Sequence, residues 1–127
     1  MNLRPLFLWA CALGIAPIAL GYGLVPGRSM PLLFETLPCD RNVLHILRAV
    51  MGLYLALAGF WVVGALRVRW RQASLVTVLL LCAGLGGGRV LSLLVDGPPH
   101  WLLSAYLVIE IVVASVAAWM LGLPDES

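Results

Sequence analysis

The sequence predicts an all-α integral membrane protein, a four-helix bundle with both termini in the cytoplasm. The first observation behind this prediction is the composition, because 62% of the 127 residues are apolar and only 11% are charged. Soluble domains are typically about 45–50% apolar and about 25% charged. The second observation is that the apolar residues fall in four long runs, which with their connections use nearly every residue. We therefore expect one four-span transmembrane domain over residues 1–127 and no separate soluble domain.

The four predicted spans cover approximately residues 5–25, 43–66, 73–95 and 101–123. Each contains about the 20 residues that an apolar helix needs to cross roughly 30 Å of hydrocarbon. The first run carries no charge from Pro5 to Gly27, and its apolar core is longer than that of an ordinary signal peptide, so we expect a retained helix. The prolines that follow Asp96 end the third span before the fourth begins.

The longest connection is a predicted outer loop over residues 26–42. It is punctuated by prolines but contains the apolar stretch Met30 to Phe34, which indicates a loop lying partly in the membrane interface. Either Asp40 or Asn42 is expected to cap the second span by accepting a hydrogen bond from its free backbone amides.

The three cysteines, Cys11, Cys39 and Cys82, form no CxxC pair, which disfavours a thiol-disulfide enzyme. Cys11 and Cys82 lie inside apolar runs, where a free cysteine behaves as a small hydrophobic residue. Cys39 lies in the polar loop, and the sequence does not decide whether it is a free thiol or forms a disulfide with another chain.

The arginines outside the apolar runs predict the orientation. Arg4 and the cluster Arg67, Arg69 and Arg71 fall on one side, and Arg28 and Arg41 on the other. Because basic residues are in excess on the cytoplasmic side of membrane proteins, the first side is expected to be cytoplasmic. The net charge of +2 is scattered along the chain, so no basic stripe for nucleic acid is present.

Small residues predict where the helices approach one another. Helices associate in lipid mainly where small residues let their backbones come close. Gly52 and Gly59 on the second span and Gly84 and Gly88 on the third recur on helical faces. We interpret these four glycines as helix-packing positions rather than as a cradle for a ligand.

Glu110, in the middle of the last apolar run, is the most informative residue of the chain. A carboxylate in hydrocarbon must be protonated or paired with a cation, and its short stem cannot carry it to the interface. Arg48 and Arg89 lie at similar depth in other spans and are the candidate partners. The sequence therefore predicts a polar site in the outer half of the bundle.

Further polar residues share faces with the two arginines. His45, Arg48 and Gly52 follow one another at helical spacing, and we expect their common face to point into the bundle. Asp96 lies two turns after Arg89 on the third span. These residues extend the candidate polar network or ligand site.

Two segments resemble a known family: NVLHILRAVMGLYL, residues 42–55, and GGRVLSLLVDG, residues 87–97. They are similar to the small bacterial membrane proteins grouped as domain-of-unknown-function family 4345, and the resemblance covers most of the chain. The family pattern falls here on Arg48, Gly52, Tyr54, Arg89, Asp96 and Glu110. The resemblance implies a four-helix protein of the bacterial inner membrane within the wider DoxX-like group, some members of which accompany quinone-linked or thiol redox enzymes. It implies no known activity.

Three hypotheses for function stay open at this point. In the first, the charged residues fix helix packing in a structural or accessory subunit, whose lipid-facing surface meets a membrane enzyme or a second copy of the chain. In the second, two arginines against one acid leave a surplus positive charge that binds an anionic lipid, a carboxylate or a quinone from the outer leaflet. In the third, Glu110 carries protons in a transporter or enzyme, although four helices without internal repeats are few for alternating access.

Catalytic signatures are missing from the sequence. It contains no HExxH, GxSxG, P-loop or dinucleotide-binding motif, and His45 and His100 have no spacing typical of a metal site. We accordingly expect no catalytic residue, no metal and no cofactor.

Overall fold

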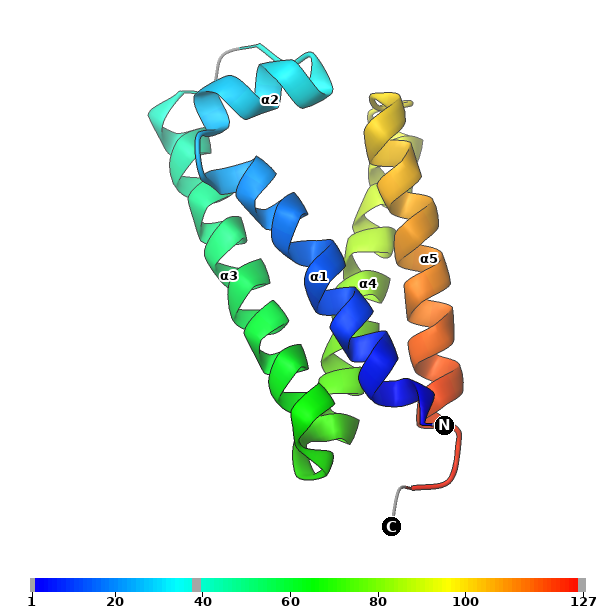
Figure 1. Ribbon diagram of the computed structural model, residues 1–127. Coiled ribbons are helices and arrows are strands. Elements are labelled where there is room, and N and C mark those ends of the chain that lie inside the picture. Colours follow the sequence, from blue (N-terminus) through cyan, green and yellow to red (C-terminus); the bar gives the residue numbers. More distant parts are fainter. Residues whose placement is uncertain (1, 38–39, 126–127) are drawn as a thin grey trace.

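The computed structural model describes residues 2–37 and 40–125, and this part of the chain is helical without strands. Five helices follow one another: α1 (Leu3–Gly23), α2 (Pro26–Phe34), α3 (Arg41–Leu66), α4 (Val68–Val95) and α5 (Trp101–Leu121) (Figure 1). The helices α1, α3, α4 and α5 are long and apolar enough to cross a membrane. The predicted all-α, four-span architecture is confirmed.

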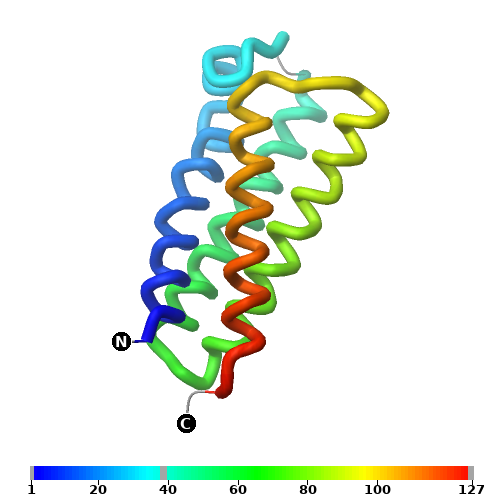
Figure 2. Tube along the Cα trace, turned by 90° about the vertical axis from the view of Figure 1, so that its right-hand side faces the viewer, coloured from blue at the N-terminus to red at the C-terminus, as the bar shows by residue number. Residues whose placement is uncertain are grey.

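The four long helices are arranged as two pairs, with α1 packed along α3 and α4 packed along α5. The α3 and α4 helices also contact each other, whereas α1 has few contacts with α4. Figures 1 and 2 show both termini at one end of the bundle and α2 across the opposite end. An even number of crossings requires the termini to share a side, while the cytoplasmic location of that side stays a prediction.

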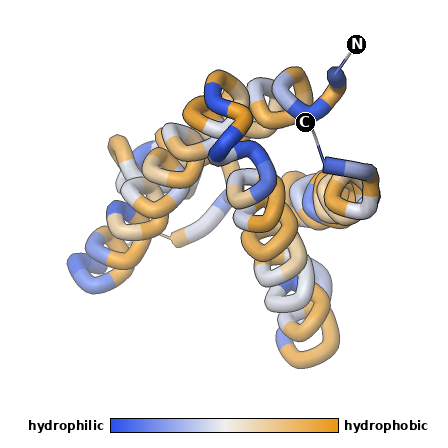
Figure 3. The backbone as a smooth tube through the Cα atoms, turned by 90° about the horizontal axis from the view of Figure 1, so that it is seen from below, coloured by the Kyte–Doolittle hydropathy of each residue, from blue (hydrophilic) through white to orange (hydrophobic). Residues whose placement is uncertain are grey.

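The outer surface of the bundle is apolar. Large side chains such as Leu13, Leu80 and Val112 are more than half exposed. Figure 3, seen from the end that carries the termini, shows hydrophobic residues around the outside of the long helices. A soluble protein would bury such residues, so this surface suits contact with lipid.

The connection between α3 and α4 is tighter than the sequence suggested, because α4 begins at Val68 and Arg67 alone separates the two helices. Arg71 explains the early start. It is buried, and its guanidinium donates from Nε to the Gly64 carbonyl at 3.1 Å and from Nη2 to the Ala65 carbonyl at 3.0 Å. The last carbonyls of a helix have no partner within the helix and carry negative partial charge, so an arginine there stabilises the end of α3.

Arg4 binds the last carbonyls of α5 in the same way. Its Nη2 lies 2.8 Å from the Met120 carbonyl and 3.1 Å from that of Leu123. Arg4 is only 5% exposed, and it ties the start of α1 to the end of α5. Two arginines that the sequence placed outside the apolar runs thus bind helix ends.

The closest helix contacts occur at glycines other than the four predicted ones. A Cβ atom at Gly64 would collide with the Ser74 side chain, and one at Gly23 would collide with Met51. At the predicted packing positions, Gly52, Gly59, Gly84 and Gly88, an added Cβ would meet no atom within 4 Å. Within the chain these four positions are open, because Gly52 and Gly59 are exposed on α3 and the other two line a cavity described below.

The predicted outer loop differs from the structure at its start. Residues 26–34 form α2, which has a proline at its N-terminus and ends where Glu35 adopts a left-handed backbone with φ 56°. Asp40 caps α3 by accepting a hydrogen bond from the Val43 amide at 2.9 Å. Of the two predicted caps, Asp40 is the one that forms, and Cys39 lies outside the described residues.

Candidate polar site and chambers

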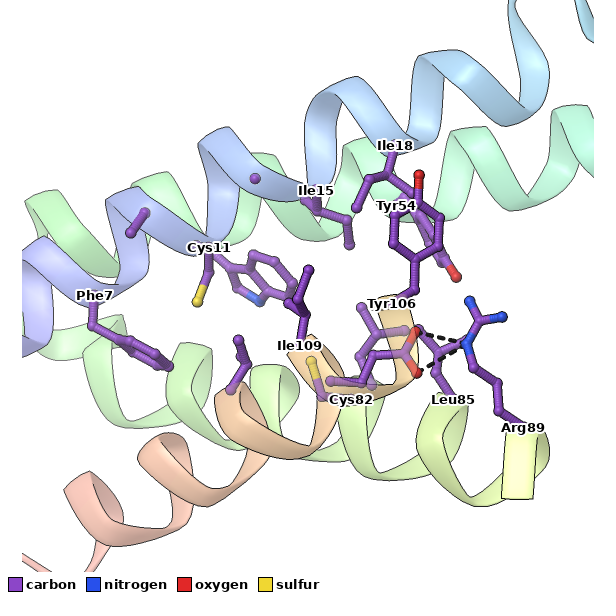
Figure 4. A pocket seen from close by; sticks show the side chains of 16 residues that line it. Phe7, Cys11, Ile15, Ile18, Tyr54, Cys82, Leu85, Arg89, Tyr106 and Ile109 are labelled. Atoms are coloured by element: carbon purple, nitrogen blue, oxygen red, sulfur yellow. Dashed lines mark hydrogen bonds and ion pairs between the residues drawn. The ribbon is translucent and has the colours of Figure 1, made fainter. Parts of the chain in front are cut away.

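Arg89 on α4 and Glu110 on α5 form an ion pair. The Arg89 Nε lies 3.0 Å from Oε1 and 2.9 Å from Oε2 of Glu110, so a single N–H is shared by both carboxylate oxygens (Figure 4). The side chains are 22% and 10% exposed, respectively. Hydrogen bonds between ionised partners are stronger than neutral ones, and this pair joins the C-terminal part of α4 to the middle of α5.

The terminal amino groups of Arg89 are not used by Glu110. A guanidinium has five N–H donors, and only the one on Nε binds the carboxylate. In Figure 4 the two terminal nitrogens point away from Glu110. The Tyr22 hydroxyl interacts with this guanidinium, and the Tyr106 ring lies 5.8 Å from its central carbon.

A cavity of about 280 Å³, here called the inner chamber, lies between the two helix pairs. Its wall is largely aliphatic and aromatic and includes Phe7, Cys11, Ile15, Leu81, Leu85 and Val113. Arg89 and Glu110 supply the charged groups of this wall. The inner chamber therefore combines a long apolar wall with one charged pair near its α2 end.

Tyr54 on α3 lines the inner chamber beside the ion pair and is only 5% exposed. Among the residues that the structure describes, its hydroxyl has no hydrogen-bond partner. Buried tyrosine hydroxyls usually find a partner. The Tyr54 hydroxyl and the terminal amino groups of Arg89 are thus polar groups with unused hydrogen-bonding capacity at one place.

A second cavity, here called the outer chamber, has a volume of about 470 Å³ and lies where α3 and α4 diverge toward α2. The glycines Gly84 and Gly88 line it, together with the side chains of Ser92 and Ser104. Tyr54, Leu85 and Arg89 line both chambers. Arg89 therefore lies at the junction of an apolar and a more polar space.

The helix α2 holds an aromatic side chain over this junction. Phe34 is buried, and its ring lies 6.0 Å from Tyr22 on α1 and 6.3 Å from Tyr106 on α5. It also contacts His100, at 6.2 Å. Since these neighbours belong to both helix pairs, α2 bridges the pairs above the site.

The structure brings together three of the predicted site residues, Arg89, Glu110 and Tyr54, and places Arg48, His45 and Gly52 elsewhere. The last three are exposed on α3, so the face they share does not point into the bundle as expected. The helical repeat gives the reason: nine residues, about two and a half turns, separate His45 from Tyr54, which puts the two on opposite sides of α3. Tyr54 belongs to the buried face.

Asp96 also lies away from the ion pair. It is the residue that ends α4, it is exposed, and it accepts a hydrogen bond from Ser92 Oγ at 2.7 Å. Its carboxylate therefore adds negative charge beside the outer chamber rather than a second partner for Arg89.

Tyr22 and Phe34 are neighbours of the site that were not predicted from the sequence. Phe34 had a usable signal, since it ends an apolar stretch within an otherwise polar connection. The two cavities have no signal in the sequence, because they depend on how far the helix pairs separate. Among the described residues no group of three or more His, Cys, Asp or Glu side chains is placed to hold a metal ion.

These features define a small multi-pass membrane protein with an ion pair at the junction of two cavities between its helices. The family model described as a domain of unknown function, DUF4345, matches residues 4–121. The match covers nearly the whole chain, and the protein belongs to this family. The wider DoxX-like grouping stays a prediction from the resemblance. No curated protein and no solved structure matches the chain.

Proposed function

We propose that the protein binds a neutral, carbonyl-bearing amphiphile in the inner chamber, with the carbonyl oxygen at Arg89 and Tyr54. The observation that carries the proposal is a pair of available donors beside one apolar cavity: the terminal N–H groups of Arg89 beyond the one that faces the Tyr22 hydroxyl, and the buried Tyr54 hydroxyl. With the orientation predicted from the arginines, this site lies on the side of the outer leaflet.

The charge of the site favours a neutral ligand. The sequence suggested two arginines against one acid, but Arg48 is exposed on α3 and lines neither chamber. One arginine and one glutamate leave no surplus charge. An additional buried anion would have no counter-charge, and such a group costs several kcal/mol. The site should therefore bind a ketone, ester or quinone carbonyl in preference to an anionic lipid or a free carboxylate.

The geometry supplies the hydrogen bonds that a carbonyl needs. A carbonyl oxygen has two lone pairs and can accept from an arginine N–H and a tyrosine O–H together. A hydrogen bond from a charged donor contributes about 1.5–3 kcal/mol and one from a neutral donor about 1 kcal/mol. The head of the ligand therefore determines its affinity, because an apolar tail coming from lipid gains little by entering an apolar chamber.

The ion pair also has a structural consequence that agrees with the accessory-subunit hypothesis, because it joins α4 to α5. A purely structural pair does not require a cavity beside it or an unpartnered tyrosine hydroxyl. Binding is accordingly the function that the arrangement supports best, and a stabilising role of the pair is compatible with it.

The proposal is tested by native mass spectrometry of the purified protein with methyl nonyl ketone, with undecane and decanoate as matched ligands lacking a neutral carbonyl. We expect the ketone to bind more tightly than either control. Arg89→Gln should weaken ketone binding by about tenfold or more, the equivalent of 1.4 kcal/mol. Arg48→Gln is the matched control, since it removes an arginine that lines no chamber.

Equal binding of ketone and undecane to the wild-type protein would overturn the proposal, because the donors would then contribute nothing. The proposal would also be overturned if Arg89→Gln and Arg48→Gln weakened ketone binding equally. A preference for decanoate over the ketone would contradict the inference from charge that the ligand is neutral.

A further inference from the structure

The inner and outer chambers share three wall residues, so one ligand can occupy both. Tyr54, Leu85 and Arg89 appear in the walls of each. A ligand whose carbonyl binds Arg89 therefore has an apolar space on one side of the carbonyl and a second space on the other. This arrangement restricts the class of amphiphile beyond the neutral carbonyl of the proposed function, on which the present inference rests.

The outer chamber offers hydroxyl groups to a ligand. Ser92, Ser104 and Tyr22 line it, and hydroxyls both donate and accept hydrogen bonds. The inner chamber offers no serine or threonine. The part of the ligand beyond the carbonyl should consequently be polar and carry hydrogen-bonding groups of its own.

The charges around the outer chamber disfavour a phosphate on that polar part. Ser92, in its wall, donates to the Asp96 carboxylate, which places a negative charge at the rim. The charge of Arg89 is already balanced by Glu110. A phosphate would lie near two carboxylates with no unbalanced cation in the chamber wall, whereas hydroxyl groups meet no such repulsion.

The inner chamber limits the length of the tail. On α4 its wall runs from Leu81 to Arg89, eight steps along the helix or about 12 Å at 1.5 Å per step. A volume of 280 Å³ holds roughly nine groups of the size of a water molecule, which takes about 30 Å³. Both figures correspond to a chain of about nine carbons, within the range of medium-chain acyl groups.

We propose that the ligand is a medium-chain monoacylglycerol or a lipid of the same chemistry. Its acyl chain lies in the inner chamber, its ester carbonyl accepts hydrogen bonds from Arg89 and Tyr54, and its glycerol hydroxyls lie in the outer chamber near Ser92 and Ser104. No covalent step is involved.

Three glycines make the proposal testable, since an added Cβ at Gly14, Gly52 or Gly88 meets no atom within 4 Å. Gly88 lines only the outer chamber, Gly14 lines only the inner one, and Gly52 lines neither. Leucine in place of Gly88 occupies part of the outer chamber, leucine in place of Gly14 occupies part of the inner chamber, and leucine in place of Gly52 occupies neither. At each of these positions the backbone accepts a Cβ atom without a collision. Native mass spectrometry then compares monodecanoylglycerol with methyl decanoate, which has the same ester carbonyl and chain but no hydroxyl groups.

We expect wild-type protein to bind monodecanoylglycerol about threefold to tenfold more tightly than methyl decanoate, as for one hydrogen bond to a hydroxyl. Gly88→Leu should abolish this difference, because it weakens binding of monodecanoylglycerol much more than binding of methyl decanoate, which has only a methoxy group on that side of the carbonyl. Gly14→Leu should weaken binding of both, and Gly52→Leu should change neither. Ser104→Ala, which removes a hydroxyl without filling the chamber, should reduce the difference as well.

The inference is overturned if the wild-type protein does not prefer monodecanoylglycerol or if Gly88→Leu retains the preference. It is also overturned if decanoyl lysophosphatidate, the anionic counterpart, binds more tightly. In each of these cases the proposed function is still supported if Arg89→Gln weakens the binding of methyl decanoate. Loss of that dependence would contradict the proposed function too.

Discussion

The Nε atom of Arg89 lies 2.9 and 3.0 Å from the two carboxylate oxygens of Glu110, which links α4 to α5 within the apolar part of the bundle. Glu110 is 10% exposed and its short side chain cannot reach the membrane interface. In this contact the terminal nitrogens of Arg89 point away from the carboxylate (Figure 4), and Arg89 lines both chambers. One pair of residues thus joins two helices and presents donors to a ligand.

Arg89 and Glu110 should stabilise the protein mainly through their interaction with each other. Glu110→Gln leaves Arg89 without its counter-charge and should lower the free energy of unfolding by about 2 kcal/mol, below the 3–5 kcal/mol of fully buried pairs because Arg89 is partly exposed. The double change with Arg89→Gln should cost less than the sum of the single changes. Steric trapping in lipid bicelles measures these values. Additive losses would show that the two residues do not interact energetically.

Arg48 should be dispensable for stability, although it lies in the segment with the family resemblance. It is exposed on α3, and no ion pair with another described residue involves it. Arg48→Gln should change the free energy of unfolding by less than about 0.5 kcal/mol, as is usual for surface substitutions. A loss comparable to that of Glu110→Gln in the same assay would mean that Arg48 has a buried partner.

The sequence predicted the number and type of the long elements well, because hydropathy and length alone decide whether a helix can cross a membrane. It predicted the start of α4 poorly. Residues Val68 to Gln72 contain two arginines and look like a polar loop, but Arg71 turns back to bind the end of α3. A contact between helices that run in opposite directions cannot be read from the composition of either one.

Arg71 should stabilise the α3–α4 hairpin. Arg71→Met keeps the apolar part of the side chain and removes the donors to Gly64 and Ala65, which should lower the free energy of unfolding by about 2 kcal/mol. Arg69→Met is the matched control two residues away, because Arg69 is exposed and lies against the Trp70 ring. Comparison of the two variants by steric trapping checks the prediction, and equal effects would contradict a capping role.

Gly64 should tolerate no side chain, whereas Gly59 should. A Cβ atom at Gly64 collides with Ser74, which itself donates to the Phe60 carbonyl at 3.1 Å. Gly64→Ala should therefore cost about 1–3 kcal/mol through overpacking. Gly59→Ala has open space and gains helix propensity, so its stability should equal or exceed that of the wild-type protein. Melting temperatures in one detergent would compare the pair, and a destabilised Gly59→Ala would indicate a neighbour on that face.

The candidate site was predicted in part. Glu110 stood out because a carboxylate in hydrocarbon requires a partner, and Arg89 was one of two arginines at suitable depth. Depth alone could not choose between Arg48 and Arg89, since that choice depends on how each helix is rotated about its axis. On α3 the rotation follows from Tyr54 and Trp61, which are seven residues apart on the buried face.

The central claim, that Arg89 and Tyr54 donate hydrogen bonds to a ligand carbonyl, is tested most directly by infrared spectroscopy of methyl nonyl ketone labelled with carbon-13 at the carbonyl. In complex with the wild-type protein, the carbonyl band should lie at lower wavenumber than for the same ketone dissolved in lipid, because hydrogen bonding weakens the C=O bond. Tyr54→Phe should reverse part of this shift, and Arg89→Gln with Tyr54→Phe should abolish it. A band of the bound ketone at the position seen in lipid would contradict the claim.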